Sequence, residues 1–559
     1  METIDSLAED DQALKKILLG IITLVIVRKV VERIRVIQLS SELPGPPLSF
    51  SNKEWVHPFL AHFYPLIMSV GSISKFPDYP NALWWYLKVG NSFAEYGICH
   101  LWAFHPYWVP FARCSNFIFD GGIAKQLLED RNNAGKLIKA KRVYDIAGPL
   151  VGDSLLSLPD GPEWKHQRKR AAASFGQRFL EHLCEISVHI LETQVFPRWQ
   201  STSGNHEAVP VEAQGVSSRL TLEILGHVAF GYTFGSFREE TADGEGESLY
   251  DCYTGMLGYC TRRNRSPPYV HLLWRKENAT FQKNSERLNK AVREVVQRRL
   301  DEQLKMEQEK SSSDGPATST PAPKDLLDYL VLKDDDGNRM PFDYIFGNVR
   351  MFFFAGHETT AGTLANGLWQ LATHPEQQQQ LQAEVDELYD GLEKNDTSAS
   401  SFPTHKQLNQ LRYLDAVARE CLRMYSPAIV GRTSTEPILL TARNGRTYNF
   451  PAGSNFFVLP FIGHMCEAYW ENATEFSPER FLASNGAGTK SGDWIPFSVG
   501  ARNCVGQPMA VAELKCLLAH IFRNYTIRPQ EGAQPPINTI LLTVKPLEVP
   551  ILVERRQHS

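Results

Sequence analysis

Hydrophobic side chains recur at helical spacing over long parts of the 559-residue chain. The clearest pattern runs from about Asp343 to Thr373, where one face of the predicted helix carries small or apolar side chains: Phe352, Ala355, Gly356, Thr359 and Thr363. A charged helix is predicted over about 284–310, and another helix starts near Pro375. Polar tracts at 309–324 and 392–403 predict loops between these helices.

The N-terminal region carries an apolar run from Ile17 to Val27 between basic residues. This run is shorter than the about 20 residues that a membrane-spanning helix needs. Lysine and arginine can extend their charged ends to the interface, which lengthens the usable segment to residues 14–34. We therefore expect residues 1–40 to be a membrane anchor, with a helix lying in the interface as the alternative. The flanking charges then place the rest of the chain on the cytosolic side.

Composition excludes some classes of protein and permits others. A hydrophobic content of 43% and an aromatic content of 11% suffice for a large core. The net charge of −5 argues against nucleic acid as the main partner. The 9 cysteines contain no C-x-x-C pair and no zinc spacing, so no disulfide framework is implied and a reducing compartment is expected.

One cysteine lies in a glycine-rich segment near the C-terminus, Phe497-Ser-Val-Gly500-Ala-Arg502-Asn-Cys504-Val-Gly506. Glycine lets the backbone approach a flat macrocycle closely. A thiolate is the form of cysteine that binds metals, and the positive charge of Arg502 favours it. As an axial ligand of haem iron, a thiolate favours O–O cleavage. We therefore predict that Cys504 ligates haem iron; the alternative is a structural cysteine in an ordinary loop.

An acid and an alcohol stand side by side inside the predicted helix 343–373, in Ala355-Gly356-His357-Glu358-Thr359-Thr360. Glycine weakens a helix, so Gly356 indicates a packing or functional reason for its presence. A hydroxyl within hydrogen-bond reach of a reacting oxygen can pass protons to it. The alternative is a solvated Glu358 and a Thr359 that hydrogen-bonds back to its own helix.

Further segments combine carboxylates, guanidinium groups and an indole. Glu420 and Arg423 lie three apart on one predicted helix face, in Glu420-Cys-Leu-Arg423. Arg480 follows in the proline-marked, non-helical segment Phe476-Ser-Pro478-Glu479-Arg480-Phe481. Trp164 and Arg168 lie four apart on a further predicted helix.

Taken in order, these segments resemble motifs of the cytochrome P-450 family, the haem-thiolate monooxygenases, and the long N-terminal region suggests a microsomal eukaryotic, fungal biosynthetic member. The resemblance implies one large fold, mainly α with small β-sheets, over residues 51–559. It also implies a proline-rich hinge at residues 41–50, which contain Leu43-Pro44-Gly45-Pro46-Pro47. Its cofactor is haem b, Glu358 and Thr359 relay protons in a groove at Gly356, and Glu420, Arg423 and Arg480 form a structural salt-bridged triad.

The resemblance also assigns residues that hold the cofactor. Buried haem propionates need cations or hydrogen-bond donors. By family position the cofactor-binding residues are Cys504, Arg502, Trp164, Arg168, Arg432, Phe497 and Gly356, with Cys504 as the metal ligand. His464 is a weaker candidate, because a single histidine more often fills a core.

The resemblance implies a membrane-bound enzyme that inserts one oxygen atom from O2 into a lipophilic substrate by hydroxylation or epoxidation. By family position, the substrate walls are expected from about residues 143–158, 214–225, 352–363, 428–431 and 538–542. Apolar residues in these ranges imply a lipophilic substrate. We expect a role in secondary metabolite biosynthesis, with a terpenoid or polyketide as substrate, at the endoplasmic reticulum and facing the cytosol.

Electrons are expected from a separate NADPH-dependent flavoprotein reductase, because no flavin domain follows Cys504. Lys165, Arg168, Lys169 and Arg170 form a basic patch that suits an acidic partner, although a solvated helix face is the alternative. Other functions remain open: a haem-thiolate isomerase or dehydratase that rearranges a peroxide without a reductase, a fatty-acid hydroxylase, or a haem-binding scaffold without turnover. The Glu358–Thr359 pair argues against the isomerase, since such enzymes often lack it.

Overall fold

The structure is a computed structural model that describes residues 94–103, 113–140, 147–200, 208–238, 249–265, 270–311, 323–334, 336–395, 402–482, 493–540 and 543–557. The predicted anchor (1–40) and hinge (41–50) lie outside these residues. Among the helices that the structure describes, none is both long and apolar enough to cross a bilayer.

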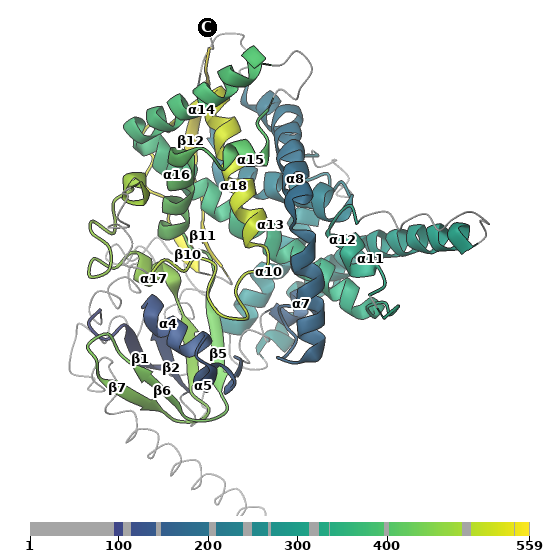
Figure 1. Ribbon diagram of the computed structural model, residues 1–559, viewed down its shortest axis with the longest axis vertical. Helices are drawn as coiled ribbons and strands as arrows, with labels where there is room; N and C mark the ends of the chain where they lie inside the picture. The colour runs from purple at the N-terminus through teal and green to yellow at the C-terminus, as the bar shows by residue number, and fades with distance from the viewer. Residues whose placement is uncertain are drawn as a thin grey trace, which may run out of the picture.

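Helices dominate the described chain and pack around one long helix, α13 (Phe342–Thr373) (Figure 1). The others are α4 (Gly121–Leu128), α5 (Arg131–Ala134), α7 (Pro162–Ser174), α8 (Gln177–Ile190), α9 (Ala213–Leu225), α10 (Leu249–Arg265), α11 (Arg275–Ser311), α12 (Leu326–Val331), α14 (Pro375–Asn395), α15 (His405–Leu408), α16 (Arg412–Met424), α17 (Pro460–His464) and α18 (Gln507–Asn524). Short π or 3-10 segments are η2 (Leu191–Val195), η3 (Phe196–Trp199), η4 (Gly226–Phe230), η5 (Val270–Leu273) and η6 (Pro478–Phe481). The predicted mainly α fold is confirmed.

Small sheets flank the helices, as predicted. The strands are β1 (Ile98–Ala103), β2 (Arg113–Ile118), β3 (Leu137–Lys139), β4 (Val209–Glu212), β5 (Val430–Ser434), β6 (Ile438–Thr441), β7 (Thr447–Phe450), β8 (Asn455–Val458), β9 (Tyr525–Pro529), β10 (Asn538–Ile540), β11 (Val544–Pro546) and β12 (Pro550–Arg555). A five-stranded sheet has the order β1-β2-β8-β5-β3, in which only β2 and β8 are parallel. The remaining strands form the sheet β4-β12-β9 and the hairpins β6–β7 and β10–β11.

Helix α13 lies in the core because its own side chains are apolar or small on nearly every face. Helices α9, α16 and α18 and strand β11 pack against it. At Gly347 another backbone segment lies very close to α13, since a Cβ atom there would lie 1.9 Å from the carbonyl oxygen of Asp153. Its observed bounds agree with the predicted range 343–373, so the periodic pattern located this helix correctly.

Other helix ends differ from the prediction. Helix α11 begins at Arg275 rather than near 284, because Trp274 and Phe281 pack against the Tyr259 ring at centroid distances of 6.2 and 4.5 Å and stabilise its first turns. It continues to Ser311 and projects from the body of the molecule (Figure 1). The predicted loops at 309–324 and 392–403 therefore start too early, since α14 also continues, to Asn395.

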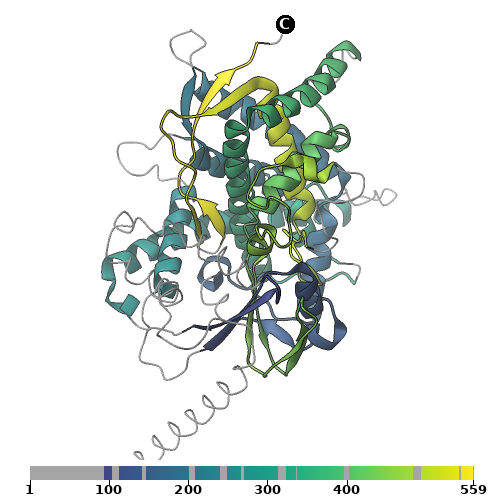
Figure 2. The ribbon, with the colours of Figure 1, turned by 90° about the vertical axis from the view of Figure 1, so that its left-hand side faces the viewer.

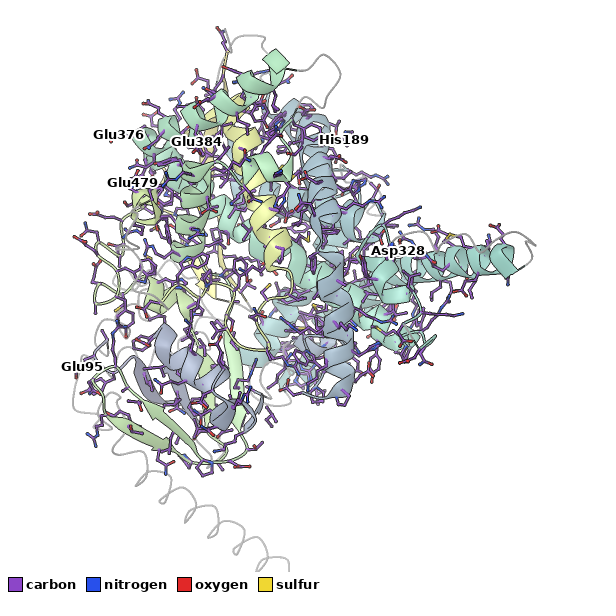
Figure 3. All side chains as sticks on the ribbon, in the orientation of Figure 1. Glu95, His189, Asp328, Glu376, Glu384 and Glu479 are labelled. Carbon is purple, nitrogen blue, oxygen red and sulfur yellow. The ribbon has the colours of Figure 1, made fainter. Side chains whose placement is uncertain are left out.

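Helix α16 is held in place by carboxylates from its neighbours rather than by a side-chain cap of its own. The backbone N–H groups of Tyr413 and Leu414 donate to the Glu384 carboxylate of α14 at 2.9 and 2.8 Å. The Tyr413 hydroxyl donates to Glu479 at 2.8 Å, and Figure 3 shows Glu384 and Glu479 on the same side of the molecule. Carboxylates at a helix N-terminus satisfy free N–H groups and complement the helix dipole.

The predicted triad forms on this helix. Arg423 donates to both Glu420 oxygens at 2.8 Å, and the Nε atom of Arg480 lies 3.1 Å from the same carboxylate. The other N–H groups of Arg423 donate to backbone carbonyls of His464, Ala473 and Glu475. Glu420 and Arg423 are fully buried, so this paired network joins α16 to the segment around η6. The proline-marked segment itself forms a 3-10 turn, which the non-helical prediction missed.

Candidate active site

The cysteine segment forms a tight loop that ends where α18 begins. The Cys504 backbone N–H donates to the Phe497 carbonyl at 3.0 Å, and the Asn503 N–H donates to the Gly500 carbonyl at 3.1 Å. Gly500 has a φ of 80°, and a Cβ atom there would lie 2.4 Å from the Leu128 carbonyl oxygen. Only glycine combines this conformation with so close a contact, so Gly500 lets the loop lie against the end of α4.

The Cys504 thiol is exposed, although the surrounding protein desolvates it and thereby raises its pKa. The thiol can be exposed and desolvated at the same time because it faces an opening within the protein. The backbone N–H groups of Gly506 and Gln507, at the start of α18, donate to the sulfur, and the charge of Arg168 acts on it, so all of them lower the pKa. A helix N-terminus and a nearby cation stabilise a thiolate. The sulfur is thus placed to bind a metal.

Helix α18, which follows the cysteine loop, packs against α13. Near this contact lies Glu513 of α18, which is fully buried. Neither of its carboxylate oxygens has a well-formed hydrogen bond among the described residues, although the Thr360 hydroxyl of α13 lies near enough to act on it. Burial raises the Glu513 pKa well above its usual range, which keeps the group protonated. Sequence reasoning missed Glu513, because nothing in an isolated sequence distinguishes it from a surface glutamate.

The predicted groove on α13 is a partly exposed face in an otherwise buried stretch. Ala355, Gly356 and Thr359 are partly exposed, whereas their neighbours Phe354, His357 and Thr360 are buried. A Cβ atom on Gly356 would lie 3.0 Å from the Leu225 side chain, so close packing against α9 is one reason for a glycine here. The Thr359 hydroxyl donates to the Ala355 carbonyl at 3.0 Å, which is the back-bonded geometry of the structural alternative.

The carboxylate of Glu358 is engaged elsewhere. The Tyr253 hydroxyl of α10 donates to it at 2.8 Å, and the Lys545 ammonium of β11 lies 2.5 Å from its other oxygen. The predicted acid and alcohol therefore have separate partners in this conformation. Tyr253 and Lys545 were missed because they lie far from Glu358 in the sequence and in no recognisable motif.

Trp164 and the nearby arginines meet at the cysteine loop. The Trp164 indole is buried, and its N–H has no acceptor among the described residues. The Arg502 guanidinium lies 3.9 Å from the centre of the Trp164 ring and forms an ion pair with Asp160 at 2.5 Å. Arg168 donates to the Asn503 carbonyl at 2.9 Å, so it fastens α7 to the loop. A buried indole N–H without an acceptor is rare and suits an additional acceptor at this place.

A lysine that the sequence did not reveal joins this group. Lys139 of β3 is paired in register with Arg432 of β5, and both side chains are buried. Burial, and after it the charges of Arg502 and Arg432, lower the Lys139 pKa to about 6, while Asp160 acts in the opposite direction. Buried positive charge of this kind is costly unless an anion compensates it. Lys139 has no sequence signal, because lysines are ordinarily exposed.

Two other predictions change with the structure. His464 is fully buried, and both ring nitrogens face backbone groups, the Arg423 carbonyl and the Ile495 N–H, each at 3.0 Å. It is therefore a structural residue rather than a propionate partner. In the basic patch only Lys165 and Lys169 are exposed, since Arg168 contacts the cysteine loop and Arg170 donates to the Leu332 carbonyl at 2.7 Å.

The expected substrate walls are partly core. Range 214–225 lies within α9, whose Leu220, Leu222, Ile224 and Leu225 side chains are buried against neighbouring helices. Helix α10, which reaches Glu358 through Tyr253, was absent from the expected walls. The ranges 143–158 and 538–542 extend beyond the described residues at 143–146 and 541–542.

Haem fits this collection of residues. Cys504 offers a soft anionic ligand with supporting N–H groups, and thiolates suit iron. The Trp164 N–H, the Lys139 amine and the guanidinium groups of Arg432 and Arg502 are donors that match the carboxylates of a haem. Ala355, Gly356 and Thr359 give α13 a face of small, partly exposed side chains.

A family model for cytochrome P450 matches residues 117–552. The chain belongs to the cytochrome P450 family. It is similar to cytochrome P450 4V2 of Rattus norvegicus, at 27% identity over 408 residues that cover 71% of this chain and 73% of the relative. Identity to probable cytochrome P450 4p3 of Drosophila melanogaster is 28% over 459 residues, or 79% of each chain. Identity to the cytokinin hydroxylase of Arabidopsis thaliana is 29% over 413 residues, or 71% of each.

This P450 is thus a haem-thiolate monooxygenase, and its cofactor is haem. Membership of the family also implies an electron-transfer partner and a lipophilic substrate.

Proposed function

We propose that this P450 hydroxylates a lipophilic small molecule, with Cys504 as the iron ligand and with Thr359 and Glu358 as proton carriers. The observation that carries the proposal is the partly exposed face of Ala355, Gly356 and Thr359 on a helix packed against α18, at whose start Cys504 lies. A relative whose name is cytokinin hydroxylase supports hydroxylation as the reaction.

The described residues supply the iron ligand, the groups that stabilise its negative charge, and the carriers of protons to the bound oxygen. Haem held by Cys504 supplies the activation of dioxygen once it is reduced. The N–H groups of Gly506 and Gln507 and the charge of Arg168 hold negative charge on the sulfur. The Thr359 Oγ1 atom donates to the Ala355 carbonyl and keeps lone pairs with which it accepts a proton for onward transfer. Glu358, the preceding residue in the sequence, is the acid that returns a proton to the Thr359 hydroxyl.

We infer that the substrate is a biosynthetic intermediate of terpenoid or polyketide type and that the enzyme works at the endoplasmic reticulum membrane. The described surface supports membrane contact near η5, where Leu272 and Leu273 are 63% and 79% exposed. Arg262, Arg263, Arg275 and Lys276 are exposed around them, and cations beside apolar side chains suit an anionic lipid surface. Replacing both leucines by aspartate should reduce flotation of the protein with anionic vesicles.

We further infer that a separate NADPH-dependent flavoprotein reductase docks at α7, because Lys165 and Lys169 are exposed there, next to the cysteine loop that Arg168 contacts. Charge reversal at Lys165 and Lys169 should slow the first reduction of the haem and weaken its salt dependence. A rate unaffected by charge reversal would place the docking site elsewhere.

The proposed reaction is tested with purified protein, reductase, NADPH and a panel of lipophilic metabolites that includes terpenoids, polyketides and fatty acids. Binders are found by substrate-induced shifts of the haem spectrum, and products are analysed for one atom of labelled oxygen from 18O2. Thr359→Ala should divert electrons to hydrogen peroxide, and Cys504→Ser should abolish the thiolate-type carbonyl spectrum. Turnover of an organic peroxide without reductase or O2 would instead support the isomerase or dehydratase.

A further inference from the structure

Four arginine side chains are buried in the described part of this P450, and one of them has no carboxylate partner. Arg423 and Arg523 pair with carboxylates at 2.8 and 3.0 Å, and Arg432 lies among the donors that match the haem carboxylates. Arg350 of α13 is 8% exposed and forms no ion pair with a described residue. Burial lowers its pKa only to about 10, so the group stays charged at neutral pH. A buried charge without a counterion is costly, so Arg350 indicates an anion that the described residues do not supply.

The Arg350 guanidinium also leaves most of its donors unused. Its Nη2 atom donates to the Pro149 carbonyl at 2.7 Å, and its Nε–H is buried without an acceptor among the described residues. The Nη1 atom makes no hydrogen bond with those residues either. The unused N–H groups form a planar fork that matches the two oxygens of a carboxylate. A buried donor without a partner is rare in folded proteins, which favours a ligand at this place.

Further unpaired cations lie near Arg350. Burial raises the pKa of the Cys260 thiol on α10 to about 11, and the charges of Arg263 and Arg350 act in the opposite direction, so both lie near this thiol. The centre of the Phe346 ring lies 5.8 Å from the Arg350 guanidinium and 4.8 Å from that of Arg293 on α11. Arg263 and Arg293 are exposed, and neither pairs with a carboxylate of the described chain. Three guanidinium groups thus gather where α10, α11 and α13 meet, and Figure 2 shows the teal helices α10 and α11 beside the central helices.

Arg350 lies on the other side of α13 from the face that carries Thr359. The two residues are nine positions apart, about two and a half turns, so they are roughly 13 Å apart along the axis and on opposite sides. The loop that binds Arg350 through Pro149 continues to Leu155, whose N–H donates to Asn348 at 2.9 Å. Asn348 is about three turns before Thr359 and therefore on the same side of the helix. The loop thus passes around α13 from the arginine to the reaction face.

We propose that Arg350 is the centre of an anion-binding site, formed by α13, the loop at 147–155 and α10, that takes the carboxylate of an amphiphilic acid. The guanidinium fork holds the carboxylate, and the half-buried Phe346 ring suits an apolar body beside it. The exposed Arg263 and Arg293 attract the acid from solvent.

The acid has two possible sources. One is the substrate, whose chain would follow the loop from Arg350 to the Thr359 face; this source rests on the proposed function. The other is a second molecule, which occupies the Arg350 site while the substrate lies at the haem. Both sources present the same carboxylate to the same fork.

The test measures binding as the rise in thermal unfolding midpoint of the ferric holoenzyme. Dodecanoate, below the concentration at which it forms micelles, is compared with dodecan-1-ol as the matched neutral ligand. The wild type should bind the acid about tenfold or more tightly than the alcohol, because charge-assisted hydrogen bonds contribute at least that factor. Arg350→Gln should remove this preference, and Arg350→Lys should keep part of it, since the charge remains and the fork is lost. Abietate and abietinol repeat the comparison with a terpenoid body.

Matched variants separate a ligand site from a structural arginine. Arg178→Gln removes an exposed arginine of α8 and should leave the preference for the acid unchanged. Without ligand, Arg350→Gln should keep or raise the unfolding midpoint, because it removes an uncompensated buried charge. An acid preference that survives in Arg350→Gln would overturn the site. Equal binding of acid and alcohol to the wild type, or equal protection by inorganic phosphate, would overturn it as well.

Clotrimazole, an azole that ligates haem iron, distinguishes the two sources. If the acid is the substrate, it shifts the haem spectrum and clotrimazole displaces it. If the acid is a second molecule, the protection that depends on Arg350 persists with clotrimazole bound. Either result supports the site. If the preference for the acid depends on Arg350 but no lipophile is hydroxylated with reductase and NADPH, the proposed function fails while the anion site stands.

Discussion

Two buried carboxylates in this P450 carry the same charge but are held in opposite ways. Glu420 accepts a bidentate pair from Arg423, a further bond from Arg480 and the Ser477 N–H at 2.9 Å. Glu358 accepts single contacts from Tyr253 and the partly exposed Lys545. The planar Arg423 guanidinium uses all its donors, so its contact with Glu420 is fixed. The Lys545 ammonium is flexible and reaches water, so its contact with Glu358 can open. The first suits support of the fold, and the second suits a reaction cycle.

The largest expected difference concerns stability. Glu420→Gln leaves Arg423 as an uncompensated buried charge and should lower the free energy of unfolding by about 3–5 kcal/mol. Glu358→Gln should lower it by only about 1–2 kcal/mol, because the Lys545 ammonium can turn to water. Denaturant unfolding of both holoenzymes checks this. Equal losses would remove the distinction between the two sites.

Exchanging the cations sharpens the same comparison. Arg423→Lys loses the bidentate fork and donors to three backbone carbonyls, so we expect a loss of about 2–3 kcal/mol in unfolding free energy. Lys545→Arg should change stability by less than about 1 kcal/mol. Thermal unfolding of both variants beside the wild type gives the ranking, and a larger loss for Lys545→Arg would contradict it.

The region around Glu420 should also respond to pH through His464. Burial, and secondarily the charge of Arg423, lowers the His464 pKa to about 3. The unfolded chain binds a proton at this histidine near its ordinary pKa of about 6.5, while the folded protein does not. Stability should therefore fall as the pH drops below about 6.5, by about 2 kcal/mol between pH 7 and pH 5. Unfolding midpoints of His464→Asn should lack this part of the slope; an unchanged slope would exclude His464 as its source.

The smallest expected effect concerns cofactor retention at Lys139. Lys139→Met removes one hydrogen-bond donor of the cluster with Arg432 and Arg502 and should weaken haem binding about tenfold, measured by transfer of haem to apomyoglobin. Lys136→Met, on a partly exposed lysine just before β3, is the control and should have no effect. Unchanged transfer from Lys139→Met would show that the cluster is compensated within the protein.

Much of the fold was predictable from local patterns. The spacing of apolar residues located α13 to within one residue, since a buried helix leaves a long periodic signal. The start of α11 was not predictable, because ring contacts with Tyr259 of the preceding helix α10 stabilise turns whose sequence is mostly charged. Range 214–225 shows the same limit, since several of its apolar residues are buried against neighbouring helices, which the sequence did not show.

The family, the cysteine loop and the salt-bridged triad could be predicted from the residues alone, because they are short motifs whose residue types are set by chemistry. Which groups compensate the charges of these motifs follows from the packing of distant segments. Lys139, Tyr253, Glu513 and Lys545 come from strands and helices that meet the motifs in space, and burial gives them properties that no local pattern encodes. Electrostatic function depends on distance and desolvation, which are set by packing rather than by order along the chain.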